Sequence, residues 1–124
     1  MNKKLNEWFG RGFEPQVTME QIMVEGQEKV KEWDIDPRIG CITDGDDEYE
    51  ERPKGMYMKL NHRNYSDMIF ITLDWDDTYH VRFINQNEEV THEIEFIYCD
   101  QLFDVIDRYI NFGILTKVSQ EQLN

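Results

Sequence analysis

The sequence predicts an α+β fold, in which an antiparallel β-meander of four to five strands carries an N-terminal and a C-terminal helix on one face. Residues 67–98 contain three runs of alternating apolar and polar residues separated by short polar loops, which is typical of consecutive antiparallel strands. Apolar residues recur at helical spacing before this region and after it, which predicts one helix at each end. With 124 residues, the chain fits one domain, residues 1–124, built as a two-layer sandwich.

The first helix is predicted to follow an N-terminal arm, residues 1–15. Thr18 and Gln21 have the spacing of a capping box, so we expect the helix to begin at Thr18. Its apolar stripe continues to Trp33, and the Asp-Pro sequence at 36–37 ends the element. Gly26 lies on this stripe and predicts that a strand approaches the helix closely there.

The strands are predicted at residues 38–43, 56–61, 67–75, 78–85 and 89–98. A loop at residues 75–77 pairs Leu73 with Tyr79, and a two-residue loop at 86–87 pairs Phe83 with Val90. This register gives a core face formed by Ile69, Ile71, Leu73, Tyr79, Val81, Phe83, Val90, Ile94 and Phe96.

The last helix is predicted to begin near Asp100 as its N-cap, with an apolar stripe from Leu102 to Ile110. Gly113 is a natural residue to follow its C-terminus. Residues 114–124 form a C-terminal tail that either adds one short strand or has no regular structure.

The net charge is −13, from 26 acidic and 13 basic residues. Acids and bases balance in residues 1–31 and again in 113–124, so the surplus lies between them. Binding to nucleic acid needs clustered Lys and Arg, and anionic membranes make the same demand, so neither is an expected partner. A basic protein surface or a cation is the natural complement. The alternative is that the charge reflects a generally acidic proteome or a halophilic host.

The acidic residues fall on a loop at 44–51, on the hairpin tip at 74–77 and on the polar face of the sheet. An exposed tryptophan among carboxylates suits an interface anchor. We therefore expect a partner-binding site formed by Asp44, Asp46, Asp47, Glu48, Glu50, Glu51, Asp74, Trp75, Asp76, Asp77, Glu93 and Glu95.

No pattern in the sequence supports catalysis, a cofactor or a metal site. The 44–51 loop resembles the start of a calcium loop, but Tyr49 replaces the required glycine and Gly55 replaces the final glutamate. The predicted register places His80 and His92 on opposite faces, so they do not share a metal. Cys41 and Cys99 are expected to be buried free thiols. Without a signal peptide or an apolar run of about 20 residues, the sequence predicts a cytoplasmic protein.

These observations favour a small acidic, non-enzymatic binding protein. The most specific version of this hypothesis is a phage or mobile-element inhibitor, a viral protein that acts as a DNA mimic on a nucleic-acid-handling protein. A toxin-neutralising immunity protein is a close alternative. Two further alternatives are a divalent-cation-binding domain of frataxin-like layout and a housekeeping subunit without a ligand of its own.

Overall fold

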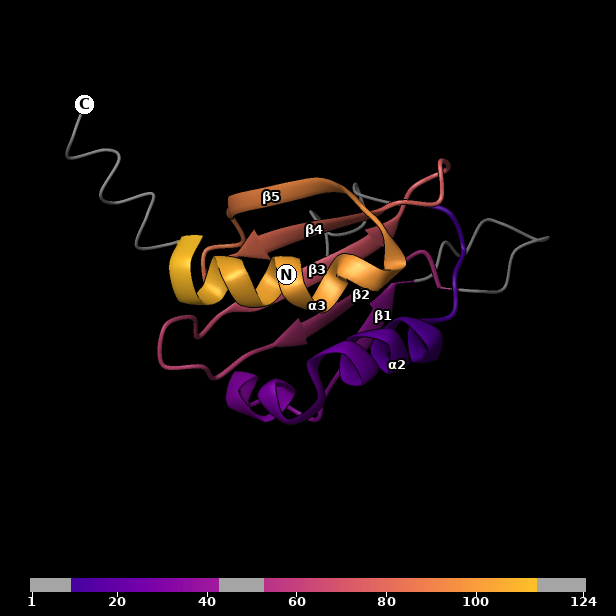
Figure 1. Cartoon of the computed structure of the whole chain (residues 1–124). Helices are drawn as coiled ribbons and strands as arrows, with labels where there is room; N and C mark the ends of the chain where they lie inside the picture. The colour runs from indigo at the N-terminus through magenta and orange to yellow at the C-terminus, as the bar shows by residue number, and fades with distance from the viewer. Residues whose placement is uncertain (1–9, 43–52, 114–124) are drawn as a thin grey trace, which may run out of the picture.

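The computed structural model describes residues 10–42 and 53–113. Five antiparallel strands form one open sheet in the order β1-β2-β3-β4-β5, with bounds Gly40–Ile42, Gly55–Lys59, Met68–Leu73, Tyr79–Ile84 and Val90–Ile97. Two helical segments pack against it (Figure 1): α2 (Pro15–Gly26) with η1 (Gln27–Trp33), then η2 (Cys99–Gln101), α3 (Leu102–Arg108) and η3 (Tyr109–Gly113). The predicted α+β meander with a helix at each end is confirmed. The predicted tail at 114–124, the acidic loop at 44–51 and most of the predicted arm lie outside the described residues.

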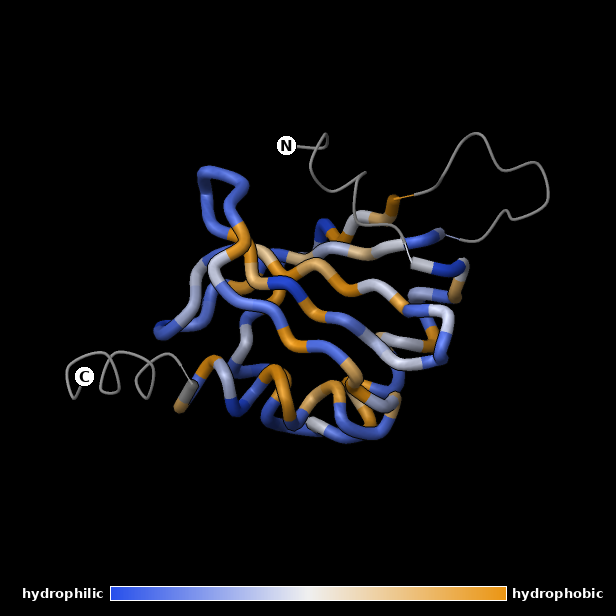
Figure 2. Tube along the Cα trace, turned by 90° about the horizontal axis from the view of Figure 1, so that it is seen from above, coloured by the Kyte–Doolittle hydropathy of each residue, from blue (hydrophilic) through white to orange (hydrophobic). Residues whose placement is uncertain are grey.

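The main core lies between the sheet and the two helical segments, and polar and apolar residues alternate along the strands above it (Figure 2). Trp33 is fully buried, stacks on Phe103 with ring centroids 5.0 Å apart, and donates a hydrogen bond from Nε1 to Asp107 Oδ1 at 3.0 Å. Each large apolar side chain buried in this way contributes about 1.5–3 kcal/mol. The fully buried residues of this core include Ile22, Trp33, Met56, Met58, Leu60, Ile69, Ile71, Val81, Phe83, Leu102 and Ile106.

Helix α2 begins at Pro15, three residues earlier than predicted, with Glu14 as its N-cap residue. Proline suits the first helical turn because its φ is already helical and its missing amide has no partner there. Thr18 therefore lies inside the helix rather than at its cap. Its hydroxyl is buried and forms a 2.9 Å hydrogen bond with the Tyr79 hydroxyl, which ties the helix to the sheet.

Gly26 does permit a close approach, but the approaching element is helix α3 and not a strand. A Cβ built at Gly26 would lie 2.5 Å from Phe103 Cδ2 and 2.3 Å from Val30 Cγ2. The predicted single helix also changes character here, because Gln27 has φ 48° and the chain continues as a 3₁₀ segment to Trp33. The C-terminal helical segment begins at Cys99 with Tyr98 as its N-cap residue, and not with Asp100 as predicted. The Gln101 side chain supports this start, because its Oε1 accepts a hydrogen bond from the Tyr98 backbone N–H at 3.2 Å.

The register between β3 and β4 is as predicted, with Leu73 opposite Tyr79. The register between β4 and β5 is not, because Phe83 pairs with His92 instead of Val90. Glu88 has φ 64° and lengthens the predicted two-residue loop by one residue, the geometry of a three-residue hairpin loop with a left-handed third position. A register shift on β5 between the Ile84–Val90 and Phe83–His92 pairs adds the second residue of the difference.

A second irregularity follows on β5, where Tyr79 pairs with Ile97 and Phe96 has φ 60°. The extra residue turns Phe96 out of the core, so that its side chain is 68% exposed and Ile97 is buried in its place. Phe96 and the exposed Val90 are therefore removed from the predicted core face.

The opposite face of the sheet carries a smaller apolar cluster near β1, formed by Ile42, Phe70 and Ile84 with Tyr57 and Met68 packed against them. Two strand glycines make room for it. A Cβ at Gly55 would lie 2.5 Å from Phe70 Cζ, and a Cβ at Gly40 would lie 2.0 Å from Tyr57 Cζ. This face is consequently apolar toward β1 and polar toward β5.

Candidate functional site: an acidic and aromatic end of the sheet

Six of the twelve predicted partner-binding residues lie in the described part of the chain: Asp74, Trp75, Asp76 and Asp77 in the β3–β4 turn, and Glu93 and Glu95 on β5. The structure brings them to one region, because the start of β4 pairs with the end of β5 through Tyr79 and Ile97. The other six lie outside the described residues: Asp44, Asp46, Asp47, Glu48, Glu50 and Glu51.

Hydrogen bonds and an ion pair made by its own aspartates fix the shape of the β3–β4 turn. Asp76 Oδ1 accepts hydrogen bonds from the backbone N–H of Thr78 at 3.1 Å and from its hydroxyl at 2.6 Å. These bonds favour the carboxylate and lower the pKa of Asp76. Asp77 forms an ion pair with Arg11. The turn thus presents Trp75 to solvent on a fixed frame, with 84% of its surface exposed.

The acidic residues of β5 surround a buried histidine on the polar face. His80 Nε2 lies 3.0 Å from Glu93 Oε2, and His80 Nδ1 lies 3.9 Å from Glu95 Oε1. Arg82 Nε lies 3.5 Å from the same Glu93 oxygen, so Glu93 is already partnered by a cation. His80, Arg82, Glu93 and Glu95 therefore form one polar network on this face.

Asp74 stands between this network and the turn. Its partial burial raises its pKa, an effect that His80 and Arg82 oppose and that Asp76 and Glu95 reinforce. Asp74 forms no ion pair with a Lys or Arg among the described residues, and the same holds for Asp76, Glu95 and Asp100. The part of the predicted site that lacks a direct ion pair with Arg or Lys is therefore smaller than expected, since Arg11 pairs with Asp77 and Arg82 pairs with Glu93.

Two exposed aromatic residues that were not predicted as site residues lie beside these carboxylates. Phe96 and Tyr98, at the end of β5, are 68% and 61% exposed. No glycine or turn motif in the sequence marks the positive φ that turns Phe96 outward. We call the combined surface the acidic–aromatic end, formed by Asp74, Trp75, Asp76, Glu95, Phe96, Tyr98 and Asp100.

The two cysteines are described residues with a potentially reactive group. Cys41 and Cys99 are free thiols but both are exposed, contrary to prediction, because Cys41 lies on the edge strand β1 and Cys99 opens a short surface turn. Apolar surroundings on one side of Cys41 raise the pKa of its thiol, which keeps it protonated and weakly nucleophilic at neutral pH.

A metal-ligand geometry occurs once among the described residues, where ligand atoms of His80, Glu93 and Glu95 lie within 4.8 Å of one another. The Arg82 guanidinium beside Glu93 already supplies positive charge to this group. His92 lies on the other face, as predicted, and stacks on Tyr109 with ring centroids 4.3 Å apart.

In the described residues no helix has the length and apolar character needed to cross a bilayer. Comparisons with models of protein families, with curated proteins and with solved structures found no match to this chain.

Proposed function

We propose that this chain is a non-enzymatic binding protein that docks its acidic–aromatic end on a basic protein surface. The observation that carries the proposal is the grouping of three exposed aromatic rings, Trp75, Phe96 and Tyr98, at one end of the sheet beside unneutralised carboxylates. Large aromatic side chains of this kind supply most of the binding energy of protein interfaces when they are desolvated. Carboxylates around them favour positively charged partners and repel acidic ones.

The proposed partner is a protein that handles nucleic acid, because such proteins carry the clustered Lys and Arg that an acidic surface complements. The chain would then act as an inhibitor that competes with nucleic acid for a basic groove, in the manner of a phage or mobile-element protein. Neutralisation of a basic nuclease by an immunity protein would use the same surface. The cation-binding alternative has less support, because Arg82 already compensates part of the charge around His80.

The first experiment isolates the partner and measures its salt dependence. The purified chain is immobilised, a lysate of the source organism is applied at about 50 mM salt, and bound proteins are eluted at about 500 mM salt and identified. A purified partner is then titrated with the chain in the presence and absence of duplex DNA. We expect affinity to fall with salt, and DNA to compete. A partner whose affinity is unchanged by both would contradict the proposal.

The second experiment assigns the surface. Trp75→Ala and Phe96→Ser are each expected to weaken binding of that partner by about tenfold or more, because each removes an aromatic anchor. The matched control is Val24→Ser, which removes an exposed apolar side chain from helix α2, away from this end. Equal losses for the control and the aromatic variants would place the interface elsewhere.

A further inference from the structure

A second candidate binding surface lies at the opposite edge of the sheet, where β1 has β2 as its only strand neighbour among the described residues. Helix α2 runs along this side of the sheet (Figure 1). An open groove separates the helix from the edge strand, with a volume of about 610 Å³ in its central part and continuous extensions toward both ends of α2. We call it the β1 groove, and it is lined by Pro15, Met19, Met23, Ile35, Ile39 and Cys41.

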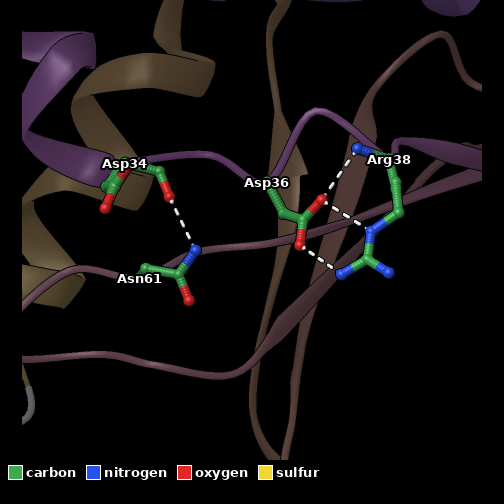
Figure 3. Close-up of polar contacts among 4 residues, drawn as sticks. All are labelled: Asp34, Asp36, Arg38 and Asn61. Atoms are coloured by element: carbon green, nitrogen blue, oxygen red, sulfur yellow. Dashed lines mark hydrogen bonds and ion pairs between the residues drawn. The ribbon is translucent and has the colours of Figure 1, made fainter.

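The segment that leads into β1 is held in place by its own polar contacts (Figure 3). Both carboxylate oxygens of Asp36 bind Arg38: Oδ1 accepts from the backbone N–H at 2.9 Å and from Nε at 3.1 Å, and Oδ2 accepts from the guanidinium at 2.9 Å. Asn61 donates to the Asp34 carbonyl at 3.2 Å. The wall of the groove that carries Ile35 and Ile39 is therefore pre-organised.

The groove leaves apolar side chains in contact with water. Met23 is 52% exposed, although it follows the buried Ile22 in α2, and Ile39 is 38% exposed. Methionine adapts its shape to different apolar partners, and three methionines, Met19, Met23 and Met56, contribute to the lining. An open strand edge beside an apolar groove and a helix is the arrangement that binds extended peptides by strand addition.

The charges around the groove favour a ligand with a positive charge. Glu14 and Glu20 stand at the rim of its central and N-terminal parts without a basic residue in the lining there. At the far end the lining includes Lys31, which is paired with Glu28 at 2.9 Å. With a net charge of −13, a second copy of the chain would be repelled, whereas a basic segment would be attracted.

We propose that the β1 groove binds an extended, basic segment of a partner protein, which adds to β1 as a sixth strand. Its alternate apolar side chains enter the groove over Met19 and Ile39, and its Lys or Arg side chains lie toward the acidic rim. This site is separate from the acidic–aromatic end and does not depend on the function proposed for it.

The test uses a fluorescent seven-residue peptide of alternating lysine and valine, titrated into the full chain and followed by anisotropy and by ¹⁵N NMR. We expect saturable binding with the largest shifts at the amides of residues 39–42. Replacing lysine by glutamate in the peptide, or methylating its backbone amides, should weaken binding by about tenfold or more, because the first removes charge complementarity and the second removes strand pairing. Absence of saturable binding, or equal binding of all three peptides, would overturn the proposal.

Variants of the chain test whether the peptide binds in the β1 groove. Met23→Ser and Ile39→Ser should each weaken binding of the lysine–valine peptide by about tenfold, while Val24→Ser, an exposed change on α2 outside the lining, should leave it unchanged. Circular dichroism checks that the variants are folded, and the NMR shifts of the unaltered chain test the location independently. Trp75→Ala should bind the peptide normally, which separates this site from the acidic–aromatic end. Shifts confined to β5 would overturn the assignment.

Discussion

The two edges of this sheet differ in length, charge and packing. β1 has three residues, lies beside a helix, and has aromatic rings packed on Gly40 and Gly55 close by. β5 has eight residues, carries Glu93 and Glu95, and is interrupted by two irregularities. Charges and bulges are common protections of an open edge against uncontrolled pairing, and β5 has both. Among the described residues β1 carries neither a charge nor a bulge, and its protection is its short length and the neighbouring helix, which leaves a groove beside the strand.

The largest difference in stability is expected when one phenylalanine is truncated in each of these two parts of the sheet. Phe70, on the central strand β3 and in the apolar cluster that includes Ile42 of β1, is fully buried, whereas Phe96 on β5 is largely exposed. Phe70→Ala is expected to lower the free energy of unfolding by about 3–5 kcal/mol, because it empties a packed site. Phe96→Ala should change it by less than about 0.5 kcal/mol. Urea unfolding followed by circular dichroism measures both, and similar losses would show that the two edges are packed alike.

A smaller effect is expected from adding one methyl group on the β1 side. Gly55→Ala places a Cβ 2.5 Å from Phe70 Cζ, and the Phe70 ring is enclosed on all sides. Overpacking of this kind costs about 1–3 kcal/mol. The same urea experiment checks the loss. An unchanged free energy of unfolding would mean that the ring moves freely, and the apolar cluster at β1 would then be looser than its burial indicates.

On the β5 side, a glycine is expected to stabilise rather than destabilise. Phe96 has φ 60°, which costs a non-glycine residue about 1–2 kcal/mol, while glycine costs about 0.5–1 kcal/mol in backbone entropy. Phe96→Gly should therefore raise the free energy of unfolding by about 0.5 kcal/mol. The control is Tyr98→Gly, at an ordinary φ of −77°, which should lower it. Destabilisation by both variants would indicate that the exposed Phe96 ring contributes to packing after all.

The differences between prediction and structure follow from local geometry. The β3–β4 register was predictable because the alternation of apolar residues on both strands fits one loop length. The β4–β5 register was not, because the sequence Gln-Asn-Glu at 86–88 contains no glycine to mark the left-handed residue Glu88. Pro15 did carry a readable signal for the start of α2, and the better-known capping pattern at Thr18 obscured it.

The candidate site could also be predicted from the sequence only in part. Charge patterning located Asp74, Trp75 and Asp76, since carboxylates in a turn are visible in a sequence. Which carboxylates are neutralised was not visible, because Arg11 reaches Asp77 from 66 residues away. The β1 groove also had no signature, since it arises from where α2 lies relative to an edge strand. Contacts between distant segments therefore decide the parts of the site that the sequence leaves open.

The smallest predicted effects have opposite signs at the two edges and depend on pH. Near β1, hydrogen bonds from the Arg38 side chain and backbone lower the pKa of Asp36 from 3.8 to about 2. Its charged form is favoured in the folded state, so this stabilisation is fully present above pH 3.8 and is lost as the pH falls through about 2. Near β5, burial raises the pKa of Asp74 above its usual value of 3.8. Its charged form is disfavoured in the folded state, so this cost is present at neutral pH and disappears in acid.

Asparagine variants of these two residues test the difference through their melting temperatures at two pH values. At pH 7, Asp36→Asn should lower the melting temperature and Asp74→Asn should raise it, each by about 1–4 °C. At pH 3, the Asp74→Asn increase should vanish, because the wild-type carboxyl is then protonated in both states, whereas Asp36→Asn should retain much of its loss, since the Asp36 pKa lies lower still. Differential scanning calorimetry at both pH values gives the four shifts. An Asp74→Asn variant that is less stable than wild type at pH 7 would mean that the folded state stabilises the Asp74 carboxylate, and the acidic–aromatic end would then lose one of its unneutralised charges.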